Sequence, residues 1–343
     1  MINKRAAVLV AGSWGTALAA VLAENGHDVR IWTRNAAQAA QINERRTNAR
    51  FLPDITLPAG LTATTGIREA VREADLVLFA APSSAMREVA RAAAPHLKPA
   101  ALCVHAAKGF ETDSMKRMST VLAEELKGHE ETVVVLSGPS HAEEVVRKCP
   151  TTVVVASASQ EAAEAAQDFF INAYFRVYTN PDVIGVEVAG AIKNIIALGA
   201  GLSDGLGFGD NAKAALLTRG LAEIGRLGSA MGANVLTFAG LAGVGDLIVT
   251  CTSRHSRNWR AGSMLAEGLP LEEVLQRMGM VVEGVRTTRV AHELAKAYNV
   301  QMPITEQLHA VLFEHKEPKA AVEALMGRGR THESEEVSKA WNS

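Results

Sequence analysis

The residue with the clearest capacity for chemistry in this chain is Lys193, which lies in the apolar segment VIGVEVAGAIKNIIALGAGL. A buried ammonium group is costly unless it is paired with an anion or loses its proton. Its neighbours along one helical face, Ala189, Gly190 and Ala197, are small and leave room for a ligand. Desolvation would lower the pKa of the lysine and make it a proton carrier near neutrality. The alternative is a lysine that reaches from a core helix to water.

A second charged group lies in the segment GLAGVGDLIVTCTSRHSRNWR, residues 240–260. Asp246 could pair with a buried lysine, or it could cap the start of a helix, which aspartate after glycine suits. Basic and polar residues without an acid follow it: Arg254, Ser256, Arg257, Asn258 and Arg260. The three arginines recur every three residues, so on one helix they would share a face and could bind a doubly charged phosphate. The alternative is a solvated basic helix face.

Polar residues also follow two predicted strands. Residues 101–107 lead into Lys108, and residues 132–136 lead into Gly138 and Ser140. In a doubly wound sheet the carboxyl ends of the strands face the ligand crevice. Lys108 could therefore hold an anionic substrate, and the backbone and hydroxyl around Ser140 could bind a polyol, although either segment alone is also an ordinary loop.

These residues need a framework, and residues 5–34 have the pattern of a strand, a glycine turn, an amphipathic helix and a second strand. In a dinucleotide-binding unit, glycines such as Gly12 and Gly15 let the backbone approach a pyrophosphate and the helix pack on the strand. Val10 stands where the G-x-G-x-x-G fingerprint has its first glycine, so an ordinary βαβ turn is the alternative. The second strand ends at Arg34 without the acid of an NAD site, which favours NADPH or the use of both cofactors.

Strand and helix patterns alternate as far as residue 180. Strand-like runs occupy residues 61–64, 75–80, 101–107, 132–136, 151–156 and 175–178, with helical patterns at 84–94, 114–126 and 160–171. Beyond them the chain is rich in Ala, Leu and Gly, with helical patterns over residues 183–201, 211–231, 271–278, 287–298 and 304–313. We predict an α/β protein with a doubly wound Rossmann-type sheet in residues 1–180 and an all-helical substrate-binding and catalytic domain in residues 181–343.

Composition limits the partners. With 48% hydrophobic and 21% charged residues and a net charge of -2, the chain is expected to be globular, without a nucleic-acid partner or a membrane span. An odd number of cysteines without metal or CxxC spacing suits the cytoplasm: Cys103, Cys149 and Cys251. Three histidines match no ligand spacing, so we expect no metal and predict that they are exposed or have hydrogen-bond partners: His141, His255 and His292.

Taken together, these segments resemble the bacterial NAD(P)-dependent glycerol-3-phosphate dehydrogenases over nearly the whole chain. The resemblance rests on ordered motifs: AGSWGTALA, AAKGFE, LSGPSHAEE, VAGAIKN, GLGFGDNAKAALLTRGL, FAGLAGVGDLIVTCTSRHSRN and VVEGV. It implies hydride exchange between sn-glycerol 3-phosphate and NAD(P)+, giving dihydroxyacetone phosphate and NAD(P)H. It also implies a supply of glycerol 3-phosphate for phospholipid synthesis, and a homodimer is one assembly that the sequence leaves open.

The resemblance implies roles by position. Lys193 matches the family's proton-transfer residue, and Asp246 matches the acid beside it. The positions that hold glycerol 3-phosphate are Lys108, Gly138, Ser140, Lys193, Asp246, Ser256, Arg257 and Asn258. The positions around the cofactor are Gly12, Ser13, Trp14, Gly15, Arg34, Lys108, Ala142, Arg257, Val281 and Glu283. At Val10 the family has glycine; because valine disfavours positive φ, we expect the fold to survive and cofactor binding to suffer.

Two other functions stay open on these residues. A related 3-hydroxyacid dehydrogenase also uses a helix lysine followed by asparagine, and it would oxidise a carboxylate substrate. A cofactor-binding regulator impaired at Val10 is the non-enzymatic alternative. The joint presence of Lys193, Asp246, Arg257 and Asn258 argues against the regulator.

Overall fold

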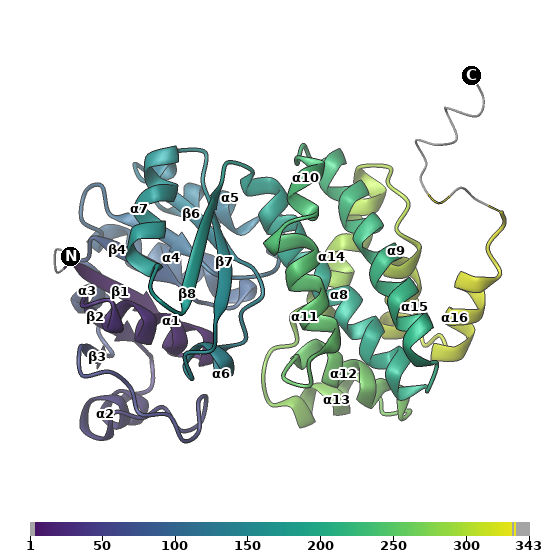
Figure 1. The fold of residues 1–343 in the computed structure, drawn as a ribbon, viewed down its shortest axis with the longest axis horizontal. Coiled ribbons are helices and arrows are strands. Elements are labelled where there is room, and N and C mark those ends of the chain that lie inside the picture. Colours follow the sequence, from purple (N-terminus) through teal and green to yellow (C-terminus); the bar gives the residue numbers. More distant parts are fainter. Residues whose placement is uncertain (1–3, 331–332, 334–343) are drawn as a thin grey trace.

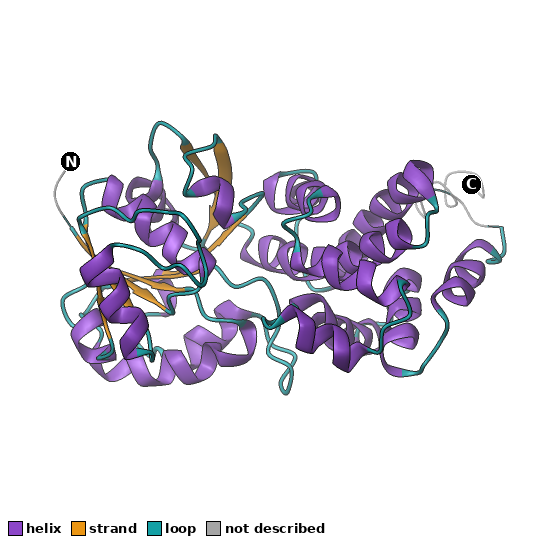
Figure 2. Ribbon diagram, turned by 90° about the horizontal axis from the view of Figure 1, so that it is seen from below, coloured by secondary structure: helices purple, strands orange, loops and turns teal. Residues whose placement is uncertain are grey.

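A computed structural model of the chain describes residues 4–330 and 333. An eight-stranded sheet fills one half and helices fill the other (Figures 1 and 2). The strands are β1 (Arg5–Leu9), β2 (Asp28–Trp32), β3 (Leu61–Thr64), β4 (Leu76–Phe79), β5 (Leu102–His105), β6 (Val133–Ser137), β7 (Thr151–Ala156) and β8 (Phe175–Asn180). Their order is β3-β2-β1-β4-β5-β6-β7-β8, and among them β6 and β7 are the antiparallel neighbours. The mostly parallel, Rossmann-type sheet predicted from the sequence is therefore confirmed.

Helices cover both faces of this sheet. They are α1 (Ser13–Glu24), α2 (Ala36–Arg45), α3 (Ile67–Val71), α4 (Met86–Ala93), α5 (Met118–Glu125), α6 (Ala142–Val145) and α7 (Gln160–Phe170). Ala6 and Val8 of β1 pack in the same core as α1, α6 and α7, whereas Ala7 and Leu9 pack with α3, α4 and α5. This alternation follows from the two-residue period of a strand, and it explains why β1 is apolar on both faces.

The ligand-facing edge of the sheet is the edge at which the parallel strands end. The strand order reverses between β1 and β4, which makes a switch point of the kind where nucleotides bind. The turns that leave this edge carry Gly12 after β1, Arg34 after β2, Ser83 after β4, Lys108 after β5 and Gly138 after β6. Most of the predicted site residues of the first domain thus lie at the carboxyl edge of the sheet.

The second half is helical and is built around α8 (Val183–Gly205). Around it lie α9 (Gly209–Ala230), α10 (Val235–Phe238), a π-helical turn (Leu241–Gly245), α11 (Asp246–Thr252), α12 (Arg257–Ala266), α13 (Leu271–Met278), α14 (Glu283–Ala297), α15 (Pro303–Phe313) and α16 (Pro318–Met326). A Cβ atom on Gly262 would lie 2.0 Å from the carbonyl oxygen of Leu198, and one on Gly201 would lie 1.8 Å from that of Trp259. Because glycine occupies both positions, α8 and α12 can cross with their backbones in contact.

Two helical stretches of the described residues are long and apolar enough to span a membrane by length and composition. In the first, Val183–Gly205, 89% of the apolar 18-residue window is buried inside the fold, so its apolar character is explained by its place at the centre of the helical domain. In the second, Val235–Thr252, 44% of the window is buried; this stretch contains α10, the π-helical turn and α11.

Side chains from both halves cross between them, and three of these contacts lie at Phe110, Glu187 and Glu283. Phe110, from the segment that follows β5, is 2% exposed and belongs to the core of the helical domain. Glu187 of α8 accepts hydrogen bonds from the backbone and hydroxyl of Ser119 and pairs with Arg117. Glu283, the first residue of α14, accepts a hydrogen bond from the backbone N–H of Ser83 at 3.0 Å and one from its hydroxyl at 2.7 Å.

Candidate functional site

The centre of the candidate site is a carboxylate held between two lysines. Lys193 is 5% exposed, and its Nζ donates to Oδ1 of Asp246 at 2.5 Å and to Oγ1 of Thr250 at 2.6 Å. The other carboxylate oxygen, Oδ2, accepts from Nζ of Lys108 at 2.7 Å. Asp246 makes no helix-capping bond and is 1% exposed. Lys193 is therefore a buried, paired lysine, and Asp246 is its counter-ion.

The charges in this cluster shift the acidity of both partners. Burial lowers the pKa of Lys193 to about 8, a shift that Asp246 opposes and the positive charge of Lys108 reinforces. Burial acts to raise the pKa of Asp246, but the two neighbouring lysines outweigh it and hold that pKa below its usual range. The carboxylate is thus ionised at neutral pH, while the lysine can gain or lose a proton close to neutrality.

A chain of amides connects this cluster to α12. The Asn194 side chain donates to the carbonyl oxygen of Lys108 at 3.0 Å and accepts from Nδ2 of Asn258 at 2.8 Å. Oδ1 of Asn258 in turn accepts from the backbone N–H of Gly284 at 2.8 Å. Lys108 also donates to the carbonyl oxygen of Gly138 at 2.9 Å, and that oxygen accepts from the Ser140 hydroxyl at 2.8 Å. The structure therefore joins six of the eight predicted substrate residues in one network: Lys108, Gly138, Ser140, Lys193, Asp246 and Asn258.

The prediction that three arginines share one helical face is wrong. The side chain of Ser256 accepts from the backbone N–H of Trp259, so the helix α12 begins at Arg257. Arg254 lies in the turn before this cap and does not share a helical face with Arg257 and Arg260. Arg257 is exposed at the start of the helix, and its Nη1 donates to the carbonyl oxygen of Val281 at 3.4 Å. A helix N-terminus with an arginine beside it suits an anion.

The turn after β1 fits a dinucleotide. A Cβ atom on Gly15 would lie 2.3 Å from the carbonyl oxygen of Val10, so only glycine lets α1 pack this close to β1, whereas one on Gly12 would meet nothing within 4 Å. The indole Nε1 of Trp14 is buried and has no hydrogen-bond partner among the described residues. Ser13 donates to the carbonyl oxygen of Phe51 at 3.0 Å. Open space beside a helix N-terminus and an unused donor are what a cofactor's phosphates and amide would use.

Val10 adopts a left-handed conformation with φ of 84°. This is the positive φ that the glycine of the fingerprint would accept more easily than valine. A β-branched residue there is a backbone outlier. Arg34, in the turn after β2, is exposed and pairs with Glu88 at 2.7 Å. Of the remaining cofactor positions, Ala142 begins α6 and is buried, Val281 precedes α14, and Glu283 holds Ser83 of the loop after β4.

Two residues of the site network were missed in the sequence. Thr250 lies one helical turn after Asp246 on α11, a spacing that could have indicated a shared face. Asn194 directly follows Lys193, but only the crossing of α8 and α12 reveals its partner, Asn258.

The histidine prediction needs a correction. His255 is exposed and His292 stacks on His309, whereas Nε2 of His141 is buried with no partner in the part of the chain that the structure describes. Burial and then the charges of Lys193 and Lys108 lower the pKa of His141, so it stays neutral beside the site. Among residues 4–330 and 333, no three His, Cys, Asp or Glu side chains gather as a metal site.

Comparisons with known proteins agree on one family. Residues 5–163 match the family described as NAD-dependent glycerol-3-phosphate dehydrogenase N-terminus, and residues 182–323 match the corresponding C-terminus. The chain is 58% identical over 335 residues to glycerol-3-phosphate dehydrogenase [NAD(P)+] of Bacillus subtilis, covering 97% of each. It is 60% identical over 331 residues to that of Geobacillus thermodenitrificans, covering 96% of each. A crystal structure of glycerol-3-phosphate dehydrogenase from Coxiella burnetii superposes with a TM-score of 0.90 at 39% identity, covering 95% of this chain and 99% of that one.

Proposed function

Because the chain belongs to the family of NAD-dependent glycerol-3-phosphate dehydrogenases, we propose how its residues divide the work of interconverting sn-glycerol 3-phosphate and dihydroxyacetone phosphate with NAD(P)+/NAD(P)H. The observation that carries the proposal is the buried ammonium of Lys193, held between Asp246 and Thr250. It is a proton donor whose pKa, about 8, lies close to the working pH.

In the reductive direction, NADPH held by the turn from Gly12 to Gly15 would supply the hydride that the ketone carbon needs. Lys193 gives its proton to the carbonyl oxygen as negative charge develops there, so that the product is an alcohol and the lysine is left neutral. Asp246 keeps Lys193 charged before the transfer and orients it. In the oxidative direction the neutral lysine takes the hydroxyl proton back. The first domain contributes three residues to the substrate site, and hydrogen bonds connect them: Lys108, Gly138 and Ser140.

The phosphate of the substrate is assigned to the start of α12. Arg257 provides a planar fork for two phosphate oxygens, and the helix N-terminus adds a favourable dipole. Asn258 already links this helix to Asn194 and so to the lysines. A phosphate fixed here would aim the ketone carbon at the nicotinamide ring, which is an orientation effect.

On the cofactor side, we assign Gly12, Ser13, Trp14 and Gly15 to the pyrophosphate turn. The cofactor positions outside this turn are Arg34, Lys108, Ala142, Arg257, Val281 and Glu283. Arg34 is the only one of these that we assign to a 2′-phosphate, since β2 ends without an acid. The division into residues 1–180 for the cofactor and residues 181–343 for catalysis is part of the same proposal.

Membership of this family removes the hydroxyacid dehydrogenase as an alternative, and an intact lysine–carboxylate pair does not favour a regulator without activity. We further infer that the enzyme supplies glycerol 3-phosphate for phospholipid synthesis in the cytoplasm, which its free cysteines suit. A homodimer is one assembly that this proposal leaves open, and light scattering measures the assembly directly.

The test of the proposed function is the consumption of NADPH with dihydroxyacetone phosphate, followed at 340 nm. Lys193→Met keeps the length of the side chain and removes its proton, so turnover should fall by at least about 100-fold while NADPH still binds. Near-normal turnover by this variant would refute the role of Lys193, and no activity in the unaltered chain would refute the proposed reaction.

A further inference from the structure

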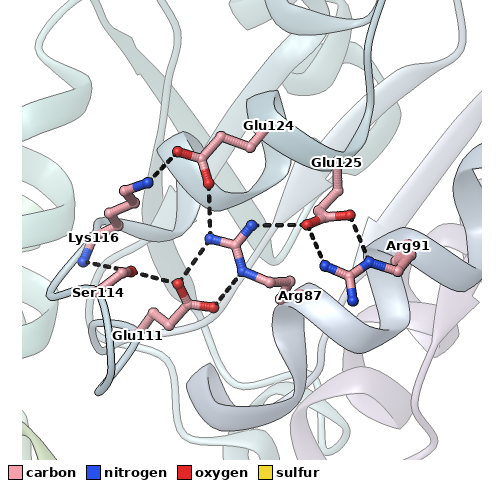
Figure 3. A network of polar contacts seen from close by, with 7 residues as sticks. All are labelled: Arg87, Arg91, Glu111, Ser114, Lys116, Glu124 and Glu125. Carbon is pink, nitrogen blue, oxygen red and sulfur yellow. Dashed lines mark hydrogen bonds and ion pairs between the residues drawn. The ribbon is translucent and has the colours of Figure 1, made fainter.

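The segment from Lys108 to Arg117 connects β5 with α5 and carries one of the two site lysines. Glu111, three residues after Lys108, is gripped by the guanidinium of Arg87 on α4. Nε of Arg87 donates to Oε1 of Glu111 at 2.7 Å and Nη2 donates to Oε2 at 2.8 Å (Figure 3). This is the bidentate geometry in which arginine binds a carboxylate most strongly. The Glu111 side chain is 15% exposed, so solvent screens the pair only in part.

Further contacts close this segment on itself. The backbone N–H of Glu111 donates to the carbonyl oxygen of Lys116 at 2.9 Å, and Ser114 donates to the Glu111 carboxylate. Phe110, between the glycine after Lys108 and Glu111, is buried in the core of the helical domain. The backbone that follows Lys108 is therefore held at two neighbouring residues. Phe110 is buried in the core of the second domain, and Glu111 is bound by Arg87 in the first.

The charged groups around Arg87 balance. Three acids, Glu111, Glu124 and Glu125, face three bases, Arg87, Arg91 and Lys116, as Figure 3 shows. The three acids belong to different segments of the chain. Glu124 and Glu125 lie on α5, whereas Glu111 lies on the Lys108 segment itself. The Arg87 guanidinium holds the pKa of Glu111 below its usual range, so the pair is ionic at neutral pH.

We propose that the Arg87–Glu111 ion pair positions Lys108 against Asp246, and that through Lys108 it sets the efficiency of the reaction. The chain of contacts runs from α4 through Glu111 and two residues of backbone to Nζ of Lys108, which lies 2.7 Å from Asp246. Arg87 and Glu111 do not contact the reacting groups and are positioning residues. The inference rests on the proposed role of Lys108.

Loss of the Arg87–Glu111 ion pair should change how the rate of the reductive reaction depends on pH. The groups that face Lys193 are Asp246 and Cys251 of α11, Lys108, and His141 before α6. Among them, Lys108 lowers the pKa of Lys193 by charge repulsion. When Lys108 moves away, that pKa rises. Since the reductive reaction needs the ammonium form, the alkaline limb of the rate profile should move to higher pH.

The experiment compares Glu111→Gln with Glu125→Gln. Glu125 is a matched control because it is 13% exposed and also pairs with Arg87, at 2.8 Å, but lies on α5. For Glu111→Gln we expect kcat with dihydroxyacetone phosphate to fall about tenfold, a part of the loss that misplacement by about 1 Å produces. The alkaline limb of the rate profile should move to higher pH. Glu111→Asp, which keeps one charged contact, should recover part of kcat.

Several outcomes would overturn the inference. One is a kcat for Glu111→Gln within about twofold of the unaltered enzyme; another is an equal loss in Glu125→Gln; a third is a loss without movement of the alkaline limb. If Glu111→Gln does not fold, the same comparison is made with Glu111→Asp. Lys108→Met separates the two proposals: if it is fully active, the assigned role of Lys108 fails, whereas if it is inactive and Glu111→Gln is normal, only the positioning role fails.

Discussion

Replacing Asp246 by asparagine removes one charge from the centre of the site and leaves its shape. The carboxylate now accepts from Lys193 at 2.5 Å and from Lys108 at 2.7 Å, and all three groups are largely shielded from water. An amide of the same size retains one oxygen acceptor but no charge. The variant therefore isolates what the negative charge does for the proton donor.

The magnitude follows from the pKa of Lys193, which is about 8. At pH 7 about nine-tenths of the lysine is then ammonium. A close opposite charge favours the charged form by roughly 1–3 pKa units, so loss of Asp246 should bring the pKa of Lys193 to about 6. About one-tenth of the lysine then remains protonated at pH 7, which alone lowers the reductive rate about tenfold. Leaving two lysines without their partner should also cost about 3–5 kcal/mol of folding stability.

The assay is the pH dependence of kcat for dihydroxyacetone phosphate at saturating NADPH. The sign is fixed by the need for the ammonium form: activity falls as the pH rises through the pKa of Lys193, and a lower pKa moves this fall toward acid. We expect the limb to move from about pH 8 to about pH 6. Asp204→Asn, which removes the carboxylate paired with Lys213 at 2.8 Å elsewhere in the helical domain, should leave the limb in place.

An alkaline limb that stays near pH 8 in Asp246→Asn would refute this reasoning. It would mean either that the limb does not report Lys193 or that Asp246 does not hold the lysine's charge. Lys193→Met distinguishes these cases, because a limb that persists without the lysine belongs to another group.

Three further predictions concern the ligand-binding residues. Val10→Gly should tighten NADPH binding, because glycine tolerates the φ of 84° and removes a branched side chain from the turn; calorimetric titration that shows equal or weaker binding would contradict this. Arg34→Ala should reduce kcat/KM with NADPH about tenfold more than with NADH, and Glu88→Gln, which releases Arg34 from its ion pair, should raise the NADPH preference by up to about fivefold; equal effects on both cofactors would exclude a contact with the 2′-phosphate. Arg257→Lys should lose most of its kcat/KM for dihydroxyacetone phosphate and little of its low activity toward dihydroxyacetone, whereas equal proportional losses would assign Arg257 to the cofactor.

The alternation of strands and helices could be predicted because each core strand is an apolar run closed by a turn. The helices α2 and α12 could not. In α2 only Ala39 and Ile42 are buried, so the segment AAQAAQINER lacks an apolar stripe. The start of α12 was not predicted because it is set by a capping hydrogen bond of Ser256. The regular spacing of the three arginines suggested instead a helix that already includes Arg254.

Within the site, Lys193 and Asp246 could be singled out because a charge in an apolar segment requires an explanation. Their distances could not be predicted, since they are 53 residues apart and meet only because α11 packs on α8. The link from Asn194 to Asn258 depends on two glycines that let α8 and α12 touch. The Nε2 of His141, which has no partner among the residues that the structure describes, was missed because sequence spacing does not reveal which side chains lack a partner.

The insertion of Phe110 into the helical core has a consequence for how the molecule comes apart. A side chain that leaves the sheet and completes the other domain's interior makes each domain's stability depend on the other. The two domains should therefore melt together in a single calorimetric transition, and a fragment ending before α8 would expose this ring to water. Cutting the chain between sheet and helices would divide one cooperative unit rather than separate two.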